Sequence, residues 1–291
     1  MEPLVTIVIP TFNRADMIGE AIDSALDQTY QNIEIIIVDD GSTDNTEALV
    51  REKYSNNARI RYAKQPNAGA SVARNHGAKL AKGTYISFLD SDDKYLPFCI
   101  QDKVNLSLTT DSGTILGGCI YFDNTGTPPI KPTPPRIKTT YQDLCIFTFC
   151  PGGTNNIFVK RQLFQDVGGF REDLADSEDR DLLRRLARIA NIASVQKTTV
   201  AVRIHSGERV GRNLKKSAND RYSISKNIPE RWLRTKSMAW NAMAIGNLAW
   251  GERRFALAFV LWVKSFAIYP FSLHPELQRL RPIIRRLLGR E

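Results

Sequence analysis

Hydrophobic and polar positions alternate with two different periods over the first 90 residues. Short runs rich in β-branched residues predict strands at 4–10, 33–40, 60–64 and 84–90. Between these runs, apolar residues recur every three or four positions, which predicts helices. Residues 35–38 are continuously apolar, so this strand is expected to be buried on both faces, as in a parallel sheet. The alternation of strands and helices predicts an open α/β sheet, Rossmann-like and mostly parallel, flanked by helices.

The rest of the chain is less regular. Its pattern predicts a strand at 114–121, a strand and a helix within 150–170, a helix around 182–190 and a last strand beginning near Thr198. The Pro-rich segment 124–138 is expected to be an irregular surface loop. After about residue 215 the pattern is helical. We therefore expect an α/β domain over 1–215 and a basic helical region over 216–291.

Composition places the chain among soluble globular proteins, with 42% hydrophobic and 24% charged residues in 291. The longest apolar stretch, 255–269, is too short to cross a bilayer and contains Lys264. The N-terminus lacks the basic-then-apolar order of a signal peptide. The four cysteines show no metal-ligand spacing, so we expect free thiols and a cytoplasmic location.

The net charge of +9 is unevenly distributed. From Arg209 onward there are 17 Lys and Arg against 5 Asp and Glu, a balance of +12, which leaves −3 for the preceding residues. The positive charge therefore belongs to the tail and does not favour nucleic-acid binding. A basic tail favours peripheral contact with an anionic membrane, whereas its four tryptophans are expected to pack inside a helical subdomain.

Acidic and polar residues follow directly on three of the predicted strands, in "PTFNR", "DDGSTD" and "DSDD". Ligands of open α/β sheets bind beyond the carboxyl ends of the strands, so we expect the site at this shared edge. Asp90, Asp92 and Asp93 place three carboxylates within four positions, where they repel one another unless a cation is bound. A hard divalent cation, Mg²⁺ or Mn²⁺, suits them. The alternative is a turn with solvated acids that cap the following helix.

Two further segments at this edge suit a nucleotide. Asp39 and Asp40 could accept hydrogen bonds from a base or from ribose, although "DGS" is also an ordinary turn before a helix cap. Asn67 precedes a helix start whose free N–H groups could face a phosphate, and Arg74 follows within its first turns. An ordinary helix start requires neither residue. This segment alone therefore does not distinguish a nucleotide-binding site from an ordinary helix start.

The motifs occur together in one order: "VTIVIPTFNR", "VDDGSTDNT", "NAGASVARNHGAKLAKGTYISFLDSDD", "VGGF" and "SEDRDLLRRLA". With this combination the chain resembles the family-2 glycosyltransferases, which have the GT-A fold, over roughly residues 4–210. The resemblance implies a set of nucleotide-binding residues: Pro10, Thr11, Asn13, Asp39, Asp40, Asn67, Arg74, Asp90 and Arg209.

The resemblance also implies a metal and a base. The family's Asp-x-Asp motif falls on Asp90 to Asp92, and Mn²⁺ or Mg²⁺ is expected on Asp92, Asp93 and His205. The catalytic base of the family matches Asp179 in the pair with Glu178. Two of these residues could instead have a purely structural role. Asp179 could be an acid in the first turn of a helix, where the helix dipole favours it, and His205 could stabilise the fold.

The expected function is that of an inverting, metal-dependent, hexosyltransferase-like enzyme. It would move a sugar from a nucleotide-diphosphate donor, a UDP-sugar, to a hydroxyl of a glycan or lipid-linked acceptor in cell-surface polysaccharide or glycolipid synthesis. One rival is a catalytically silent sugar- or nucleotide-binding module of the same fold, which the intact acids disfavour. The other is a nucleotidyltransferase, which usually opens with a Gly-rich basic phosphate loop that "IPTFNR" does not match.

Overall fold

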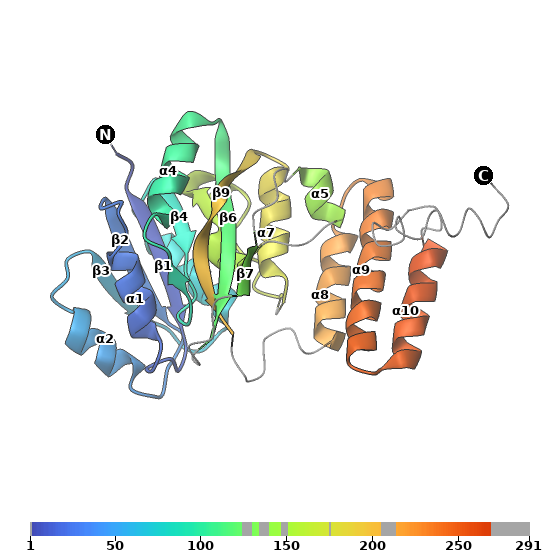
Figure 1. Ribbon diagram of the computed structural model, residues 1–291, viewed down its shortest axis with the longest axis horizontal. Coiled ribbons are helices and arrows are strands. Elements are labelled where there is room, and N and C mark those ends of the chain that lie inside the picture. Colours follow the sequence, from blue (N-terminus) through green and yellow to red (C-terminus); the bar gives the residue numbers. More distant parts are fainter. Residues whose placement is uncertain are drawn as a thin grey trace. The chain divides into compact units, whose positions relative to one another are not determined.

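The computed structural model describes residues 2–123, 130–133, 140–146, 151–174, 176–204 and 214–268. The chain divides into two compact units (Figure 1). The first comprises Met1–Leu144 and Thr148–Arg209, and the second comprises Cys145–Phe147 and Val210–Glu291.

The first unit is built on one sheet, in which the described residues form nine strands in the order β3-β2-β1-β4-β8-β6-β9-β5, with β7 beside β6. The pairs among β1 to β4 are parallel, as is β6 with β9, whereas β8, β5 and β7 pair antiparallel with their neighbours. The strands are β1 (Val5–Thr11), β2 (Ile33–Asp39), β3 (Ile60–Lys64), β4 (Tyr85–Phe88), β5 (Lys94–Tyr95), β6 (Ser112–Phe122), β7 (Ile130–Thr133), β8 (Phe158–Lys160) and β9 (Asn191–Arg203).

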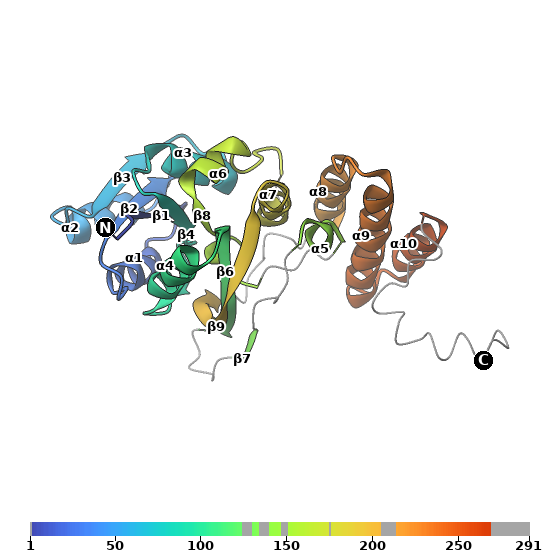
Figure 2. The ribbon, with the colours of Figure 1, turned by 90° about the horizontal axis from the view of Figure 1, so that it is seen from above.

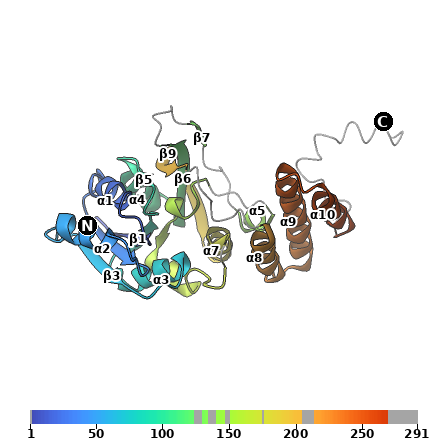
Figure 3. The ribbon, with the colours of Figure 1, turned by 90° about the horizontal axis from the view of Figure 1, so that it is seen from below.

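Helices cover both faces of this sheet. Figure 2 shows α1 and α4 on one face and α3 and α6 on the other, and the view in Figure 3 again separates α1 and α4 from α3 and α7. The helices are α1 (Ile18–Leu26), α2 (Thr46–Tyr54), α3 (Ala70–Leu80), α4 (Cys99–Thr109), α5 (Tyr141–Ile146), α6 (Arg161–Asp166) and α7 (Glu178–Ala187), and a 3₁₀ helix, η1, spans Gly153–Asn156.

The alternation of side chains along the strands gives the sheet two cores. In β2, Ile35 and Ile37 belong to the core under α1, whereas Ile36 and Val38 belong to the core under α3 and α7. All four side chains are fully buried, which confirms the expectation that this strand has no solvated face. The helix α3 approaches β1 closely at Gly77, where a Cβ would lie 2.3 Å from a Val8 methyl carbon.

The predicted α/β class and the four parallel strands of the N-terminal half are confirmed. The interpretation of 124–138 as wholly irregular is wrong, because Ile130–Thr133 forms β7 and pairs with β6. Among the described residues β7 is paired with β6 on one side, and a strand paired on one side tolerates a proline such as Pro132. The two-residue strand β5 had no signal in the pattern.

The described part of the second unit contains three helices: α8 (Leu214–Lys226), α9 (Arg231–Gly251) and α10 (Phe255–Ile268). Ser225 lies between Ser237 and Asn241 of α9, and the Ser265 hydroxyl donates to the Ala239 carbonyl at 2.7 Å. The tryptophans were expected to be buried, but Trp232 is 49% and Trp250 is 52% exposed. In each case only part of the ring surface is covered: Lys236 lies over Trp232, and Phe255 and Trp262 lie against Trp250.

Among the residues that the structure describes, no helix is both long and apolar enough to cross a membrane. Cys99, Cys119 and Cys145 are buried and form no disulfide bond with one another, and Cys150 lies outside the described residues.

Candidate active site

The loops after β1, β2 and β4 meet at one edge of the sheet, as the sequence predicted. Thr11 at the end of β1 is in register with Asp39 at the end of β2, and the Asp40 amide donates to the Thr11 carbonyl at 2.8 Å. On the other side of β1, the Leu89 amide donates to the Val8 carbonyl at 3.0 Å, which fixes the start of the acidic loop.

The carboxylates of Asp39 and Asp40 organise the loops beside them. Asp39 is fully buried; its Oδ1 accepts from the Ser42 amide at 2.6 Å and its Oδ2 from the Tyr62 hydroxyl at 2.5 Å. Burial, together with the bond to Asp39, raises the pKa of Tyr62. Asp40 accepts from the amides of Ala68 and Gly69 at 2.9 and 2.8 Å. These bonds fasten the segment before α3 to the end of β2.

Side chains of the first loop contribute to the same framework. Asn13 has a left-handed backbone, with φ +50°, and its Oδ1 accepts from the Thr43 amide at 2.9 Å. The side-chain Nδ2 of Asn67 donates to the Asp40 carbonyl at 3.0 Å. Pro10 and Thr11 are buried in β1, and the Thr11 hydroxyl has no hydrogen-bond partner within the described part of the chain. The loops after β1 and β2 are therefore joined by their own side chains.

The acidic loop after β4 is held by a residue that sequence reasoning missed, Asn155 of η1. Its Oδ1 accepts from the Asp90 amide at 2.6 Å, and its Nδ2 donates to Asp93 Oδ2 at 2.6 Å. Asp93 Oδ1 accepts from the Arg203 amide at 2.7 Å, so both oxygens of this buried carboxyl are engaged. Burial and the charges of Asp90 and Asp92 raise the pKa of Asp93 to about 8.

Asp90 and Asp92 are more accessible than Asp93, with 29% and 22% of their side-chain surface exposed. Asp92 Oδ2 lies 3.9 Å from Arg14 Nε. Within the described residues there is no group of three acidic, His or Cys side chains close enough to enclose a metal ion. Mg²⁺ and Mn²⁺ sites that take one or two carboxylates and complete their shell with phosphate oxygens do not need such a group. The donor set of this loop therefore fits a divalent cation brought together with a diphosphate.

Arg74 connects the acidic loop to the start of α7. Its side chain is only 6% exposed; Nη2 lies 2.6 Å from Asp90 Oδ1 and Nη1 lies 3.0 Å from Glu178 Oε1. Burial raises the pKa of Glu178, although the positive charge of Arg74 opposes this shift. Burial also raises the pKa of Asp179, the next residue. A Cβ on Gly153 would lie 3.8 Å from Asp179 Oδ2, so the second carboxylate faces the glycine turn before η1.

The structure thus brings together most of the residues that the sequence singled out, from five separate segments of the first unit. His205 and Arg209 lie outside the described residues, as does the whole segment 205–213. The sequence did not point to Asn155 or to Thr154, whose hydroxyl donates to Asp90 Oδ2 at 3.2 Å. The sequence feature that could have revealed them is the short segment "GGTNN". Its two glycines, Gly152 and Gly153, both adopt positive φ and allow the chain to turn toward the acidic loop.

The family model for "Glycosyl transferase family 2" matches residues 6–168, more than half of the chain. The chain belongs to glycosyl transferase family 2. A curated protein of Rickettsia felis, "Uncharacterized glycosyltransferase", is 37% identical over 211 residues, which are 70% of this chain and 35% of that protein. A "Chondroitin synthase" of Pasteurella multocida is 42% identical over 127 residues, 44% of this chain and 13% of that one. The family-2 chain thus spans about a third or less of these relatives.

Solved structures with the same fold support the GT-A assignment. A crystal structure of S. aureus TarS 1-349 in complex with UDP-GlcNAc has a TM-score of 0.67 and 20% identity, covering 90% of this chain and 79% of that one. The mannosyltransferase PcManGT from Pyrobaculum calidifontis, in complex with GDP-Man and Mn²⁺, has a TM-score of 0.60 and 16% identity, covering 98% and 81%. At this identity the likeness concerns the fold.

Proposed function

We propose that this family-2 chain is an inverting glycosyltransferase that moves a sugar from a nucleotide-diphosphate donor, a UDP-sugar, to a hydroxyl of an acceptor. The observation that carries the proposal is the placement of two acidic groups at one sheet edge. Partly exposed Asp90 and Asp92 face the edge from the loop after β4, and Glu178 and Asp179 face it from α7, with Arg74 between the two groups. Family membership and the two nucleotide-sugar complexes among the similar folds support it.

Asp179 is our choice for the base that removes the proton from the acceptor hydroxyl. A single displacement with inversion needs one such base and no covalent intermediate. Glu178 is already engaged by Arg74 at 3.0 Å, and this positive charge favours the ionised form of its carboxyl group. Burial raises the pKa of Asp179, and a more basic carboxylate accepts a proton more readily in the transition state.

For the metal we propose Asp92 as the protein carboxylate that holds Mn²⁺ or Mg²⁺. When bound there, the cation would neutralise the charge that develops on the departing diphosphate. We revise the role of Asp93, because both of its oxygens accept hydrogen bonds and burial favours its neutral form. It holds the loop in place for Asp92. His205 keeps its proposed role near the metal on the strength of the family resemblance alone.

For the nucleotide we propose the edge of the sheet formed by the loops after β1 and β2 and by the segment before α3. The residues concerned are Pro10, Thr11, Asn13, Asp39, Asp40, Asn67 and Arg74, with Asp90 toward the ribose and Arg209 toward the diphosphate. The unpaired Thr11 hydroxyl supports this placement, because a buried hydroxyl without a partner is expected to bind a ligand atom or water.

We further propose a glycan or lipid-linked acceptor and work at the cytoplasmic face of a membrane, in cell-surface polysaccharide or glycolipid synthesis. The similarity to a protein named chondroitin synthase supports the first part. The basic residues from Arg209 onward and the exposed Phe255, Phe259 and Val260 of α10 support peripheral contact with an anionic bilayer.

A donor panel tests the proposed function. The full chain is incubated with Mn²⁺ or Mg²⁺ and a series of nucleotide sugars, and the products of slow hydrolysis or transfer are identified. Free nucleoside diphosphate supports sugar transfer. Release of pyrophosphate would instead support a nucleotidyltransferase, and binding without turnover of any donor would support a silent sugar-nucleotide-binding module.

A further inference from the structure

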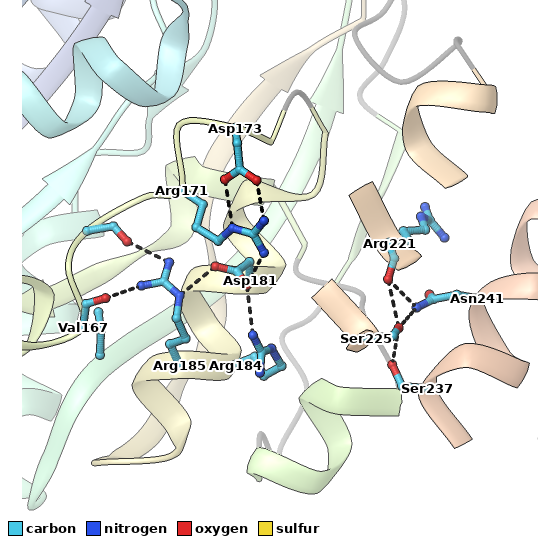
Figure 4. Close-up of polar contacts among 11 residues, drawn as sticks. Val167, Arg171, Asp173, Asp181, Arg184, Arg185, Arg221, Ser225, Ser237 and Asn241 are labelled. Atoms are coloured by element: carbon cyan, nitrogen blue, oxygen red, sulfur yellow. Dashed lines mark hydrogen bonds and ion pairs between the residues drawn. The ribbon is translucent and has the colours of Figure 1, made fainter. Parts of the chain in front are cut away.

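The turn Val167–Phe170, between α6 and α7, is held by a single arginine of α7. Gly168 and Gly169 have φ values of +78° and +70°, and this backbone directs two carbonyls toward Arg185. The Arg185 Nη1 donates to the Val167 carbonyl at 2.6 Å, and its Nη2 donates to the Gly169 carbonyl at 2.7 Å (Figure 4). The rigid planar guanidinium can make both bonds from two fixed nitrogens, whereas the flexible ammonium of a lysine has only one nitrogen.

The orientation of Arg185 is fixed in turn by Asp181, one helical turn earlier. Arg185 Nε donates to Asp181 Oδ2 at 2.7 Å, and Arg184 Nη2 donates to Asp181 Oδ1 at 3.0 Å (Figure 4). The Asp181 carboxylate is fully buried. A buried ion pair of this kind adds little net stability but constrains geometry, so its presence favours a role in orientation.

Asn75 of α3 also forms hydrogen bonds with this turn, at Phe170. The Phe170 amide donates to Asn75 Oδ1 at 2.9 Å, and Asn75 Nδ2 donates to the Phe170 carbonyl at 2.9 Å. Asn75 directly follows Arg74, whose guanidinium carbon lies 5.6 Å from the centre of the Phe170 ring. The turn therefore couples α3, which carries Arg74, to α7, which carries the acid pair.

An α-helix is stiff over a few turns, with a rise of about 1.5 Å per residue. Fixing Arg185 therefore fixes both the axial position and the rotation of the first turn of α7. That turn carries Glu178, which reaches Arg74, and Asp179. Displacement of a reacting group by about 1 Å is enough to cost on the order of 10²-fold in rate.

We propose that Arg185 and Asn75 are positioning residues, which hold the turn Val167–Phe170 from both sides and thereby set Asp179 and Glu178 relative to Arg74. The inference rests on the proposed function in that Asp179 is taken as the base. Neither Arg185 nor Asn75 needs to contact a substrate for this role.

The test compares Arg185→Lys with a matched control, Arg61→Lys. Arg61 also donates to a backbone carbonyl, that of Leu80 at 3.0 Å, but at the far end of α3. The probe is hydrolysis of UDP-GlcNAc with Mn²⁺ by the full chain, or of whichever donor the panel selects. Arg185→Lys should lower kcat by about 10- to 100-fold while KM for the donor changes less than about twofold. Arg61→Lys should keep both constants.

A second measurement separates positioning from loss of fold and does not need turnover. Peptide-resolved hydrogen exchange of the full chain should show faster exchange over 167–170 and 178–181 in Arg185→Lys and in Asn75→Ser, with unchanged protection of β1 and β2. Wild-type kcat in folded Arg185→Lys, or unchanged exchange in these two segments, overturns the inference. If the wild type turns over no donor, the proposed function fails, and the exchange result still decides whether the turn positions α7.

Discussion

The guanidinium of Arg74 lies 3.0 Å from the carboxylate of Glu178, although 104 positions separate the two residues in the sequence. The same guanidinium lies 2.6 Å from Asp90. One buried cation thus contacts both acidic groups of the site and holds the loop after β4 against the start of α7. Substitution of Arg74 or of the acids that it contacts should therefore affect both stability and activity.

Arg74→Met should destabilise the first unit by about 3–5 kcal/mol, because it leaves Asp90 and Glu178 without their shared positive partner. Adding Glu178→Gln should recover part of this loss, since the second change removes one of the uncompensated charges. Denaturant unfolding measures both free energies. Arg51→Met, which breaks an exposed pair with Glu47, should cost far less, because solvent screens that pair. Equal costs for the two arginines would contradict the bridging role of Arg74.

Asp92→Ala should abolish metal-dependent binding of UDP, because the remaining carboxyls of the loop are engaged by Arg74, by Asn155 and by the Arg203 amide. Calorimetric titration with UDP in the presence and absence of Mn²⁺ measures this. Asp102→Ala is the control, since Asp102 is an acid of α4 paired with Lys197. If Asp92→Ala keeps the full Mn²⁺-dependent affinity for UDP, the metal must be bound by other residues.

Asp179→Asn should leave donor binding intact and lower transfer or hydrolysis by about 10²–10⁴-fold, the usual range for loss of a general base. Steady-state kinetics with the donor from the panel measure the effect. Near-normal turnover in this variant would assign the base to Glu178 or to another residue.

The same substitution should also change how stability depends on pH. Burial raises the pKa of Asp179 in the folded state, so the folded protein binds its proton more tightly than the unfolded chain does. The wild type therefore loses stability as pH rises from the ordinary aspartate range to the folded pKa. Asparagine cannot ionise, so Asp179→Asn should gain thermal stability relative to wild type at neutral pH but not near pH 3. An equal difference in Tm at both pH values would show that the charge of Asp179 is not the cause.

Asn155→Ala should cost about 1–3 kcal/mol, because it leaves the Asp90 amide and one Asp93 oxygen without partners inside the protein. It should also weaken Mn²⁺-dependent UDP binding, since the acidic loop is no longer fixed. Asn105→Ala, at an exposed position of α4 where the side chain accepts from Gln101, is the control for stability. A variant that keeps both its stability and its UDP affinity would show that Asn155 does not organise the loop.

The full chain should bind vesicles that contain anionic lipid and release them as salt rises, since attraction between Lys or Arg and lipid is screened over a Debye length of about 8 Å at physiological salt. Phe259→Glu, on the exposed side of α10, should weaken this binding. Ile189→Glu, at an exposed apolar position of the first unit, should not. Co-sedimentation with anionic and neutral vesicles measures the difference. Equal binding of anionic vesicles by both variants would show that α10 does not contribute to membrane contact.

Most of the N-terminal half was predictable from the sequence for a physical reason. Strands such as Ile33–Asp39 are buried on both faces, and burial imposes a continuous apolar pattern that no surface segment needs. The edge of the sheet that carries the acids followed from the parallel order of these strands. The family assignment followed from the order of the motifs and is confirmed by the family model.

The contacts that hold the acids in place were not predictable in the same way. Asn155 reaches Asp90 and Asp93 across more than 60 positions, and an isolated Asn carries no periodicity that would reveal such a pairing. The pattern did not predict β7, because the strand contains Pro132 and the surrounding segment 124–138 is rich in proline. The exposure of Trp232 and Trp250 depends on which helix faces pack together, and helical spacing alone does not determine this.

The last strand of the sheet has a consequence for the growing chain on the ribosome. The Arg203 amide and side chain bond to the acidic loop, at Asp93 Oδ1 and at the Asp92 carbonyl. A nascent chain that ends just before β5 already contains the four parallel strands, the proposed nucleotide residues before Asp90 and all three acids of the loop after β4. It lacks η1 and β9, which fasten the loop, and α7, which carries the proposed base. The proposed donor-binding surface therefore emerges from the ribosome well before the proposed base, and the loop is fully fastened only once β9 has joined the sheet.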